Sequence, residues 1–557
     1  MKNIVCVNDF KYIEGKPIAY WISKKKRELF KKEELLSMYA DCCTGMQTGN
    51  NSKYIRYWFE VPFVNTQINN KNGKWYRYNC GGETKKWYGN YLNIVLWENN
   101  GQSIKNEKGS VIRNEKHFFE EGISWKRIAG NCFCFRVLPK DFIFDQAGDS
   151  MFVKNNKMNR CILGYINSTV ASELFSVISP TLNLTAGNMN KLPIKIEKSI
   201  SEKIEDIVNN CIDISKSDWD SREISWDYLR HPLYMKEEVK AMDKMLEEVY
   251  QKWQEECEER FSKLRFCEEK LNSIFINAYN LSDEVSPEVK DESITIKKAN
   301  YEDDIKSLIS YIVGLIMGRY SLSCDGLVYA GGKFDKSKYG DYVDEDGIVP
   351  IYSYIGINGG LVDEICKLIK IIYGEKYYQN NIDFIAKALG RKSDESAEET
   401  INRYLNDDFY NDHLKTYQKR PIYWMLSSGK QGAFKCLIYL HRYNKDTLGL
   451  INSKYFLPRT ALYKAERERL EARFATGKLD AREKRNVENE LNKVVKCEEE
   501  LLEYGQVLDH LANQYIELDL DDGVKENYVK FQGVTLQVNG ATIKKDLLVP
   551  FGLEKKK

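Results

Sequence analysis

Residues 45–61 carry the side chains with the clearest chemical meaning in this sequence. The first half is a polar loop with two glycines, which offers backbone amides and short amide side chains. The second half places Lys53 and Arg56 among four aromatic rings, those of Tyr54, Tyr57, Trp58 and Phe59. Cationic groups interleaved with flat rings suit a polyanion that has stackable bases. The same stretch also fits an ordinary loop followed by a half-buried strand.

Further basic and amide side chains between residues 41 and 200 extend this pattern. Arginine and lysine neutralise phosphates, arginine pairs with guanine, and asparagine pairs with adenine in the major groove. Each residue alone also fits an exposed charge or a turn asparagine, but together they favour nucleic acid. The candidate nucleic-acid contacts are Thr48, Gly49, Asn50, Asn51, Lys53, Arg56, Arg77, Lys85, Lys86, Tyr88, Asn90, Lys126, Arg127 and Arg136.

The charge distribution singles out the same part of the chain. The 557 residues include 83 Lys and Arg against 82 Asp and Glu, a net charge of +1. Residues 1–200 hold 30 basic and 18 acidic residues, a net of +12, so the remainder holds 53 basic and 64 acidic residues, a net of −11. This asymmetry indicates a polyanion-binding module joined to a partner-facing or solvating body, although a basic surface also serves solubility.

Sequence motifs for independent catalysis are absent. The chain contains no phosphate-binding G-x-x-x-x-G-K-[ST] loop, no G-x-G-x-x-G after a strand and no G-x-S-x-G. Its five histidines lie far apart, and with 30% charged residues the carboxylate spacings arise by chance. We therefore expect no catalytic residue, no cofactor and no metal in this chain.

The cysteines and the hydropathy indicate a reducing, aqueous compartment. Fourteen cysteines are scattered without any C-x-x-C, and the close pairs are Cys42-Cys43 and Cys132-x-Cys134. Such cysteines are typical small core residues of a reduced protein. Because no run of about 18 uncharged apolar residues occurs, we expect a cytoplasmic protein without a membrane partner.

An α+β fold is expected to position the candidate contacts. Period-2 alternation predicts strands at 75–82, 85–90, 123–128, 134–139 and 142–145, and helical spacing predicts one helix over 161–175. We expect a linker at 1–40, a mixed α/β domain at 41–200, a helical spacer at 201–287, whose first helix Ser201 could cap, a globular domain at 288–457, and a helical hairpin with a tail at 458–557.

The second half of the sequence reads as mainly helical. The apolar pattern predicts helices at 305–317, ending at Gly318, at 361–373 and at 409–417. Residues 333–347 read as an acidic linker or flexible loop, and 434–443 as a strand or a buried helix. A long charged pattern over 459–515 predicts a hairpin broken at 476–480.

Several runs resemble a known family. The run G-M-Q-T-G-N-N at 45–51, with K-Y-x-R-x-W following from Lys53, resembles the opening of target-recognition domains in fused restriction–modification methyltransferases. More closely, the chain is similar to the C-terminal part of the PglX family, the adenine-specific DNA methyltransferases of BREX phage-defence systems. The matching runs are K-W-Y-G-N at 86–90, I-S-W at 123–125, L-G-Y-I-N-S at 163–168, P-T-L-N at 180–183, G-R-Y-S-L at 318–322, K-R-P-I-Y-W at 419–424, Y-L-H-R-Y at 439–443 and D-L-D-D-G-V at 519–524.

The resemblance implies site-specific recognition of double-stranded DNA by residues 41–200. Members of the family also carry a catalytic domain that has a glycine-rich loop for S-adenosylmethionine and an Asn-Pro-Pro-Tyr motif for the flipped adenine. Neither motif occurs in these 557 residues. We therefore expect a part that is inactive in methyl transfer alone and acts with a methyltransferase catalytic domain or subunit, where S-adenosylmethionine binds.

Two other functions remain open at this point. The chain could be an enzyme in its own right, a methyltransferase or a nuclease with unrecognised motifs. Its acidic second half, residues 288–557, could instead serve as an interaction scaffold that docks to other BREX proteins of the defence system.

Overall fold

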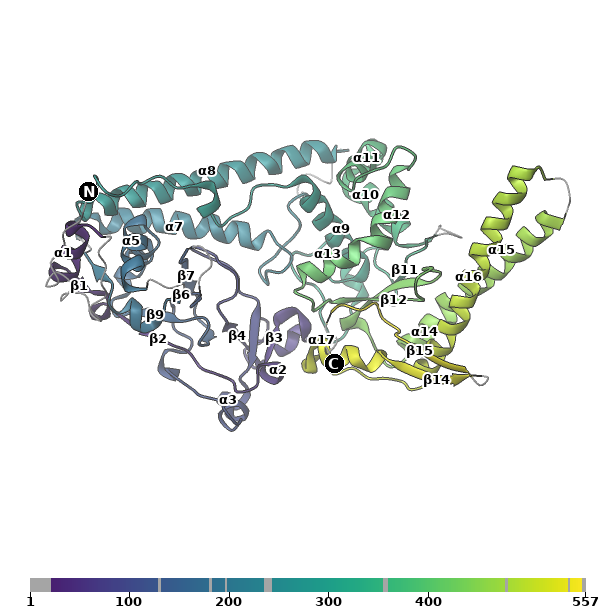
Figure 1. Ribbon diagram of the computed structural model, residues 1–557, viewed down its shortest axis with the longest axis horizontal. Coiled ribbons are helices and arrows are strands. Elements are labelled where there is room, and N and C mark those ends of the chain that lie inside the picture. The colour runs from purple at the N-terminus through teal and green to yellow at the C-terminus, as the bar shows by residue number, and fades with distance from the viewer. Residues whose placement is uncertain are drawn as a thin grey trace. The chain divides into compact units, whose positions relative to one another are not determined.

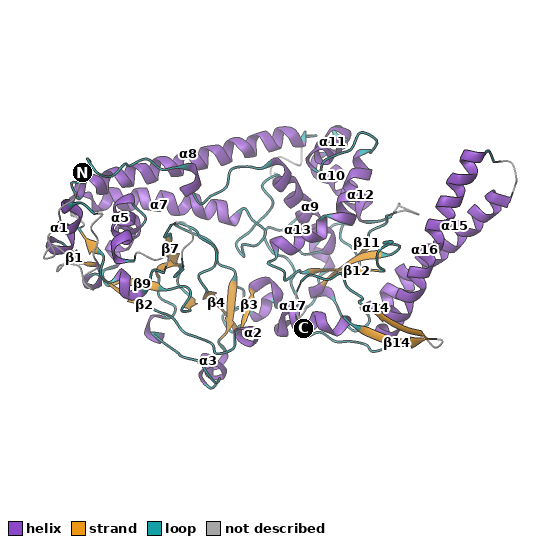
Figure 2. Cartoon of the chain, in the orientation of Figure 1, coloured by secondary structure: helices purple, strands orange, loops and turns teal. Residues whose placement is uncertain are grey.

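The computed structural model describes residues 22–128, 132–179, 183–195, 198–234, 243–353, 359–475, 479–538 and 541–552. Helices provide most of the regular structure and the strands form several small sheets, so the predicted α+β class is confirmed (Figures 1 and 2). The chain divides into two compact units. The first comprises Met1–Trp58, Asn65–Trp226 and Gln254–Ala299, and the second Phe59–Val64, Asp227–Trp253 and Asn300–Lys557. The five domains predicted from the sequence stay a prediction.

Two four-stranded sheets form most of the β structure described in the first unit. One has the strand order β2-β9-β6-β7 and is antiparallel, and the other has the order β3-β5-β4-β8, in which β8 joins β4 in parallel. A short antiparallel pair joins β1 and β10. The strands are β1 (Glu34–Leu35), β2 (Ala40–Cys43), β3 (Ile55–Tyr57), β4 (Trp75–Asn79), β5 (Asn93–Leu96), β6 (Gly122–Trp125), β7 (Phe135–Leu138), β8 (Phe142–Phe144), β9 (Ser150–Val153) and β10 (Pro193–Ile194).

One expected strand of this unit, at 85–90, is absent. Trp87, Gly89 and Asn90 have φ angles of 68°, 109° and 63°, which a strand does not accommodate. Trp87 makes a single bridge to Arg136 and is 1% exposed. The alternation of large and polar residues therefore reflects how this irregular segment buries its rings, not a sheet register.

The helix expected over 161–175 is two helices, α4 (Asn159–Ile166) and α5 (Thr169–Ile178). Asn167 ends the first because its side-chain amide exchanges hydrogen bonds of 3.0 and 2.9 Å with the backbone of Phe135. Ser168 then caps α5 by accepting from the Ala171 amide. Polar side chains that bind the backbone favour such breaks. The neighbouring residues 180–182, part of a matching run, lie outside the described residues.

Long helices complete the first unit. Helix α7 begins at Lys198, so the expected cap Ser201 lies inside it, with its hydroxyl 3.2 Å from the Cys161 sulfur. Helix α8 begins at Leu246, and residues 235–242, where a helix was also expected, lie outside the described part. The helices of this unit are α1 (Lys24–Lys32), α2 (Asn51–Tyr54), α3 (Glu98–Lys105), α4, α5, α6 (Ala186–Met189), α7 (Lys198–Asp220) and α8 (Leu246–Ala278), whose first turns belong to the second unit.

The second unit is mainly helical, and several of its helices lie where the sequence pattern predicts them. Helix α9 (Tyr301–Met317) starts after the cap Asn300 and ends at Gly318, whose φ of 79° glycine adopts without strain. The expected helices at 361–373 and 409–417 are α10 (Leu361–Tyr373) and α13 (Phe409–Thr416). The remaining helices are α11 (Tyr378–Ala388), α12 (Ala397–Asp407), α14 (Thr447–Leu450), a π-helical turn (Ile451–Phe456), α15 (Leu457–Ala475), α16 (Ala481–Ala512) and α17 (Gly523–Tyr528).

A small sheet and a helical hairpin organise the rest of this unit. The ambiguous segment at 434–443 contains strand β13 (Lys435–Tyr439), which pairs with β11 (Ile348–Pro350) and β12 (Tyr423–Ser427). Helices α15 and α16 form the expected hairpin (Figure 1), with residues 476–478 of the expected break outside the described part. Strands β14 (Val534–Val538) and β15 (Ala541–Lys545) form a second hairpin.

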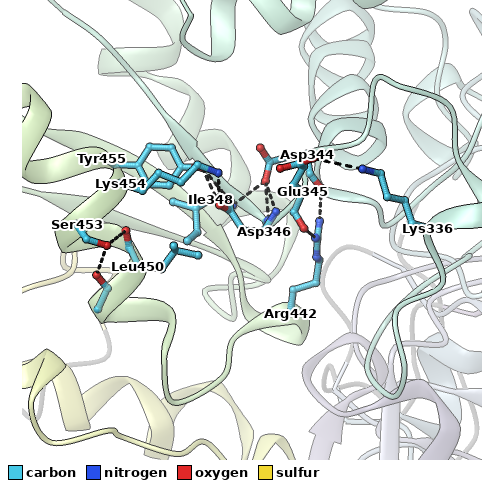
Figure 3. Close-up of polar contacts among 12 residues, drawn as sticks. Lys336, Asp344, Glu345, Asp346, Ile348, Arg442, Leu450, Ser453, Lys454 and Tyr455 are labelled. Carbon is cyan, nitrogen blue, oxygen red and sulfur yellow. Dashed lines mark hydrogen bonds and ion pairs between the residues drawn. The ribbon is translucent and has the colours of Figure 1, made fainter.

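The acidic segment expected as a linker or flexible loop ends in a tightly bonded turn (Figure 3). The Asp344 carboxylate accepts three backbone amides, at 3.1, 2.6 and 3.1 Å. Asp346 accepts from the Lys454 ammonium at 2.7 Å and from the Tyr455 hydroxyl at 3.0 and 2.9 Å. Arg442 donates to the carbonyls of the same turn, at 2.8 Å for Asp344. Asp344 thus shapes the turn, and Asp346 and Arg442 fasten it to other elements of the second unit.

Among the described residues, no single helix has the length and apolar composition needed to cross a membrane. One bent pair, Asn156–Ile166 with Thr169–Ile178, meets the requirement by length and composition only.

Candidate nucleic-acid interface

The glycine loop that opens the candidate interface is held between two neighbouring segments of the first unit. Met46 bridges to Asp145, and Gln47 exchanges two backbone hydrogen bonds of 2.9 Å with Val111. Gly49 has a φ of 75°, and a Cβ there would lie 2.8 Å from backbone atoms of Lys108 and Ser110. The loop is therefore a rigid platform that lies against the segment 105–116.

The polar side chains of this loop shape its exit into α2. The buried Thr48 hydroxyl donates to Asn51 Oδ1 at 2.5 Å. Asn50 caps α2 by accepting from the Lys53 amide at 3.2 Å and from the Ser52 hydroxyl at 2.9 Å. Asn51 is exposed, and its amide nitrogen has no hydrogen bond within the described ranges. Asn50 likewise has no hydrogen bond from its amide nitrogen to a described residue, but it is less exposed, so Asn51 is the loop amide most open to a ligand.

Cations surround this platform on the segment 105–116, and two of them were not among the residues predicted from the sequence. Lys108 and Arg113 are exposed, and their side chains have no hydrogen bond, ion pair or ring contact in the part of the chain that the structure describes. Lys53 and Lys105 are paired with carboxylates, Lys53 with Glu107 at 3.0 Å. The signal was present in the sequence as four cations within residues 105–116. We call residues 45–53 and 105–116 together the loop pair.

The arginines of the second sheet serve the fold as well as the surface. Arg56 on β3 is buried and donates to the carbonyls of Ser52 and Ile55 at 2.6 and 2.8 Å. Arg77 on β4 is half-buried, with its guanidinium 5.4 Å from the Trp226 ring and 3.7 Å from the Asp141 carboxylate. Both side chains are less exposed than those of Lys108 and Arg113 in the loop pair.

The predicted contacts at 85–90 are anchored inside the first unit. Lys85 is buried, its ammonium donates to the Thr295 carbonyl at 2.5 Å, and burial lowers its pKa to about 8. Lys86 is buried and pairs with Glu268 of α8 at 2.8 Å. The Tyr88 hydroxyl lies 3.5 Å from the ammonium of a lysine on α7, and the Asn90 amide donates to the carbonyl of Gly81 at 2.9 Å. All four side chains thus interact with other residues of the first unit.

Lys126, Arg127 and Arg136 lie on or beside the antiparallel pair β6 and β7. Arg136 is 1% exposed and donates to Asn79 Oδ1 and to the Gly81 carbonyl at 3.0 and 2.6 Å, and burial lowers its pKa. Arg127 is half-buried and donates to Asn183 at 3.3 Å. The side chain of Lys126 is half-exposed and has no hydrogen bond or ion pair to any described residue. Lys126 and Arg127 are therefore reachable from solvent, whereas Arg136 is not.

The structure thus separates the predicted cations by exposure. Arg56, Lys85, Lys86 and Arg136 are buried and bonded within the first unit. Lys53, Lys126 and Arg127 remain at the surface, where Lys108 and Arg113 join them. Among the described residues, no group of three or more His, Cys, Asp or Glu is arranged to hold a metal ion. The arrangement suits phosphate contacts around a rigid loop better than it suits bond-breaking chemistry.

Two curated proteins are similar to this chain over nearly its whole length. The adenine-specific methyltransferase PglX of Lacticaseibacillus casei (strain Zhang) is 37% identical over 545 residues, which cover 95% of this chain and 45% of the relative. The adenine-specific methyltransferase BrxX of Escherichia coli O9:H4 (strain HS) is 35% identical over 569 residues, which cover 96% of this chain and 46% of the relative. The chain spans less than half the length of these relatives, and no family model matches it.

Proposed function

Because the chain belongs to the PglX family of BREX adenine-specific methyltransferases, we propose that its residues 41–200 recognise a short double-stranded DNA site for such an enzyme. The observation that carries the proposal is the loop pair, in which a rigid polar loop lies beside Lys108 and Arg113, two cations without a partner among the described residues. Phosphate contacts position a protein on DNA and side chains on a stiff scaffold read the bases. In this scheme Asn51 faces a base edge, and Lys126 and Arg127 add phosphate contacts.

Methyl transfer belongs, in this proposal, to a catalytic domain or subunit outside these 557 residues. The glycine loop of this chain does not fit a cofactor-binding role, because Gly45 and Gly49 face backbone atoms of Phe144, Lys108 and Ser110 instead of open space. We therefore place S-adenosylmethionine on the catalytic partner. Isothermal calorimetry of this chain with S-adenosylmethionine should show no heat of binding, and micromolar affinity would instead support an enzyme in its own right.

Fluorescence anisotropy with a labelled duplex across a salt series tests the recognition step. Each phosphate contact contributes a slope of about 0.9 to the fall of log affinity with log salt concentration. The double variant K108A/R113A should therefore weaken binding and reduce the slope by about 2. K430A/K445A is the matched control, because it also removes two charges, and Lys430 and Lys445 are exposed lysines of the second unit without a side-chain partner among the described residues.

The outcomes of this experiment are distinct. Duplex affinity that is independent of salt, or an unchanged slope in K108A/R113A, would remove the loop pair from the DNA contact. An equal loss in K430A/K445A would show that the effect is one of overall charge and not of this surface.

A second candidate role, docking of residues 288–557 to other BREX proteins, is favoured by exposed apolar side chains on the helical hairpin. Leu457 and Leu462 of α15 and Leu502 of α16 are 56%, 47% and 68% exposed. Exposed apolar side chains are common singly, so the test is specific: L502E should lower recovery of other BREX proteins in a pull-down with the full chain. Unchanged recovery would exclude this face of α16 as the docking surface.

A further inference from the structure

Two cysteines lie side by side where the connection from β6 enters β7. The sulfurs of Cys132 and Cys134 are 3.5 Å apart, within hydrogen-bond distance for thiols. Cys132 is exposed and Cys134 is buried. A disulfide requires a sulfur–sulfur distance of about 2.05 Å, which rotation of two neighbouring side chains can supply when the thiols already touch. The pair is therefore accessible from one side and close to bonding geometry.

The charges around this pair favour a thiolate on the exposed member. The hydrogen bond from Cys134 and, to a smaller extent, the nearby Lys86 ammonium together lower the pKa of Cys132 to about 6, against the opposing effect of burial. The same hydrogen bond raises the pKa of Cys134, which keeps its proton. A thiolate is the reactive form of cysteine, so Cys132 is the nucleophile and Cys134 the resolving thiol.

We propose that Cys132 and Cys134 form a thiol pair that a hydroperoxide oxidises to an intramolecular disulfide. The Cys132 thiolate attacks one oxygen of the hydroperoxide and the O–O bond breaks; with hydrogen peroxide, hydroxide leaves and combines with the proton released on ionisation of Cys132 to give water. The resulting sulfenic acid reacts with the Cys134 thiol, so that the S–O bond breaks, the S–S bond forms and a second water leaves with the thiol proton. The two thiols supply the two electrons that reduce the peroxide.

Oxidation changes the charge of the segment that carries Lys126 and Arg127. A thiolate beside the buried Lys86–Glu268 pair is replaced by a neutral disulfide at the start of β7. The disulfide thereby restrains residues 132–134, just before β7. The thiol pair is thus a modification site built into the first unit, and its chemistry does not depend on DNA binding.

Peptide mapping of the full chain after treatment with stoichiometric hydrogen peroxide tests the proposal. We expect the peptide with Cys132 and Cys134 to lose two hydrogens and to regain them on reduction with dithiothreitol. The rate of this reaction should rise with pH to a midpoint near 6 and then level off, as the thiolate of Cys132 forms. In C134S, dimedone should label Cys132 as a sulfenic acid, and in C132S Cys134 should stay reduced.

Cys324 provides the matched control, because it is also an exposed cysteine of this chain. C324S should leave the oxidation of the pair unchanged, and circular dichroism should confirm that each variant is folded. Equal peroxide reactivity of Cys132 and Cys324, or a pair that stays dithiol while Cys324 is oxidised, would overturn the proposal. An oxidation rate that still rises with pH above 7.5 would overturn the thiolate assignment.

Discussion

The buried ion pair between Lys86 and Glu268 should control the stability of the first unit. The Glu268 carboxylate accepts from the Lys86 ammonium and from the indole nitrogen of Trp87, both at 2.8 Å. The two paired side chains are 10% and 4% exposed. Burial alone would lower the pKa of Lys86, but Glu268 outweighs it and the pKa is raised, so the ammonium stays charged. The pair links the segment before β5 to helix α8.

The substitution K86M removes the ammonium while keeping most of the side-chain volume. Glu268 would then be a buried carboxylate with one neutral donor, and removing one partner of a buried pair costs about 3–5 kcal/mol. The matched variant K53M breaks a pair with Glu107 in which Lys53 is 57% exposed, and such pairs contribute about 0.2–1 kcal/mol. We therefore expect K86M to be less stable than K53M by at least about 2 kcal/mol.

Urea unfolding followed by tryptophan fluorescence and far-UV circular dichroism measures the difference. K86M should lower the midpoint of the transition of the first unit, whereas K53M should leave it nearly in place. The double variant K86M/E268M should recover much of the loss, because no unpaired charge then remains buried. If K86M and K53M unfold at the same urea concentration while K86M alone weakens duplex binding, Lys86 acts as a phosphate contact and the structural argument is refuted.

Three further substitutions test other parts of the structure. G49A should lower the melting temperature more than G109A, because both glycines have a positive φ but a Cβ at Gly49 would lie 2.8 Å from backbone atoms, whereas one at Gly109 has nothing within 4 Å. The expected cost at Gly49 is about 1–3 kcal/mol, and equal melting temperatures would contradict the close packing of the loop pair. Burial raises the pKa of Asp149 to about 6, so the folded state holds a proton that the unfolded chain releases near pH 4, and stability falls as pH rises from about 4 to 6. D149N should remove this dependence of the melting temperature on pH, and an unchanged slope would reject Asp149 as its source. Y455F removes a hydrogen bond to the Asp346 carboxylate and should cost about 1.5–3 kcal/mol in calorimetric unfolding of the second unit, whereas an unchanged transition would show that the Lys454 ammonium alone holds the turn.

Local signals in the sequence predicted several of the longer helices. The apolar spacing over 361–373 and the glycine after Met317 mark element ends through interactions between near neighbours, so they are visible without tertiary contacts. The prediction of one helix over 161–175 was wrong because a tertiary contact decides the break: Asn167 ends α4 by bonding to Phe135 of a strand distant in the sequence. The prediction of a strand at 85–90 was also wrong, because the alternation of large and polar residues there reflects buried rings and not a sheet.

In the candidate interface, too, the sequence predicted some features and missed others. The sequence indicated the basic region and the polar loop at 45–51, because charge and glycine placement are properties of composition and spacing. It did not reveal Lys108 and Arg113, although the run of cations at 105–116 was a usable signal. Nor did it show that Arg56 and Arg136 are bonded to backbone carbonyls inside the first unit.

By itself, the sequence determined the α+β class, several of the long helices, the charge asymmetry and the family runs, because each depends on residue types at short spacing. Only the tertiary structure decided which cations remain free for a ligand. Lys86 finds its partner Glu268 182 residues away, while Lys108 finds none among the described residues. A buried charge needs a counter-charge or hydrogen-bond acceptors, and the fold alone brings these to it.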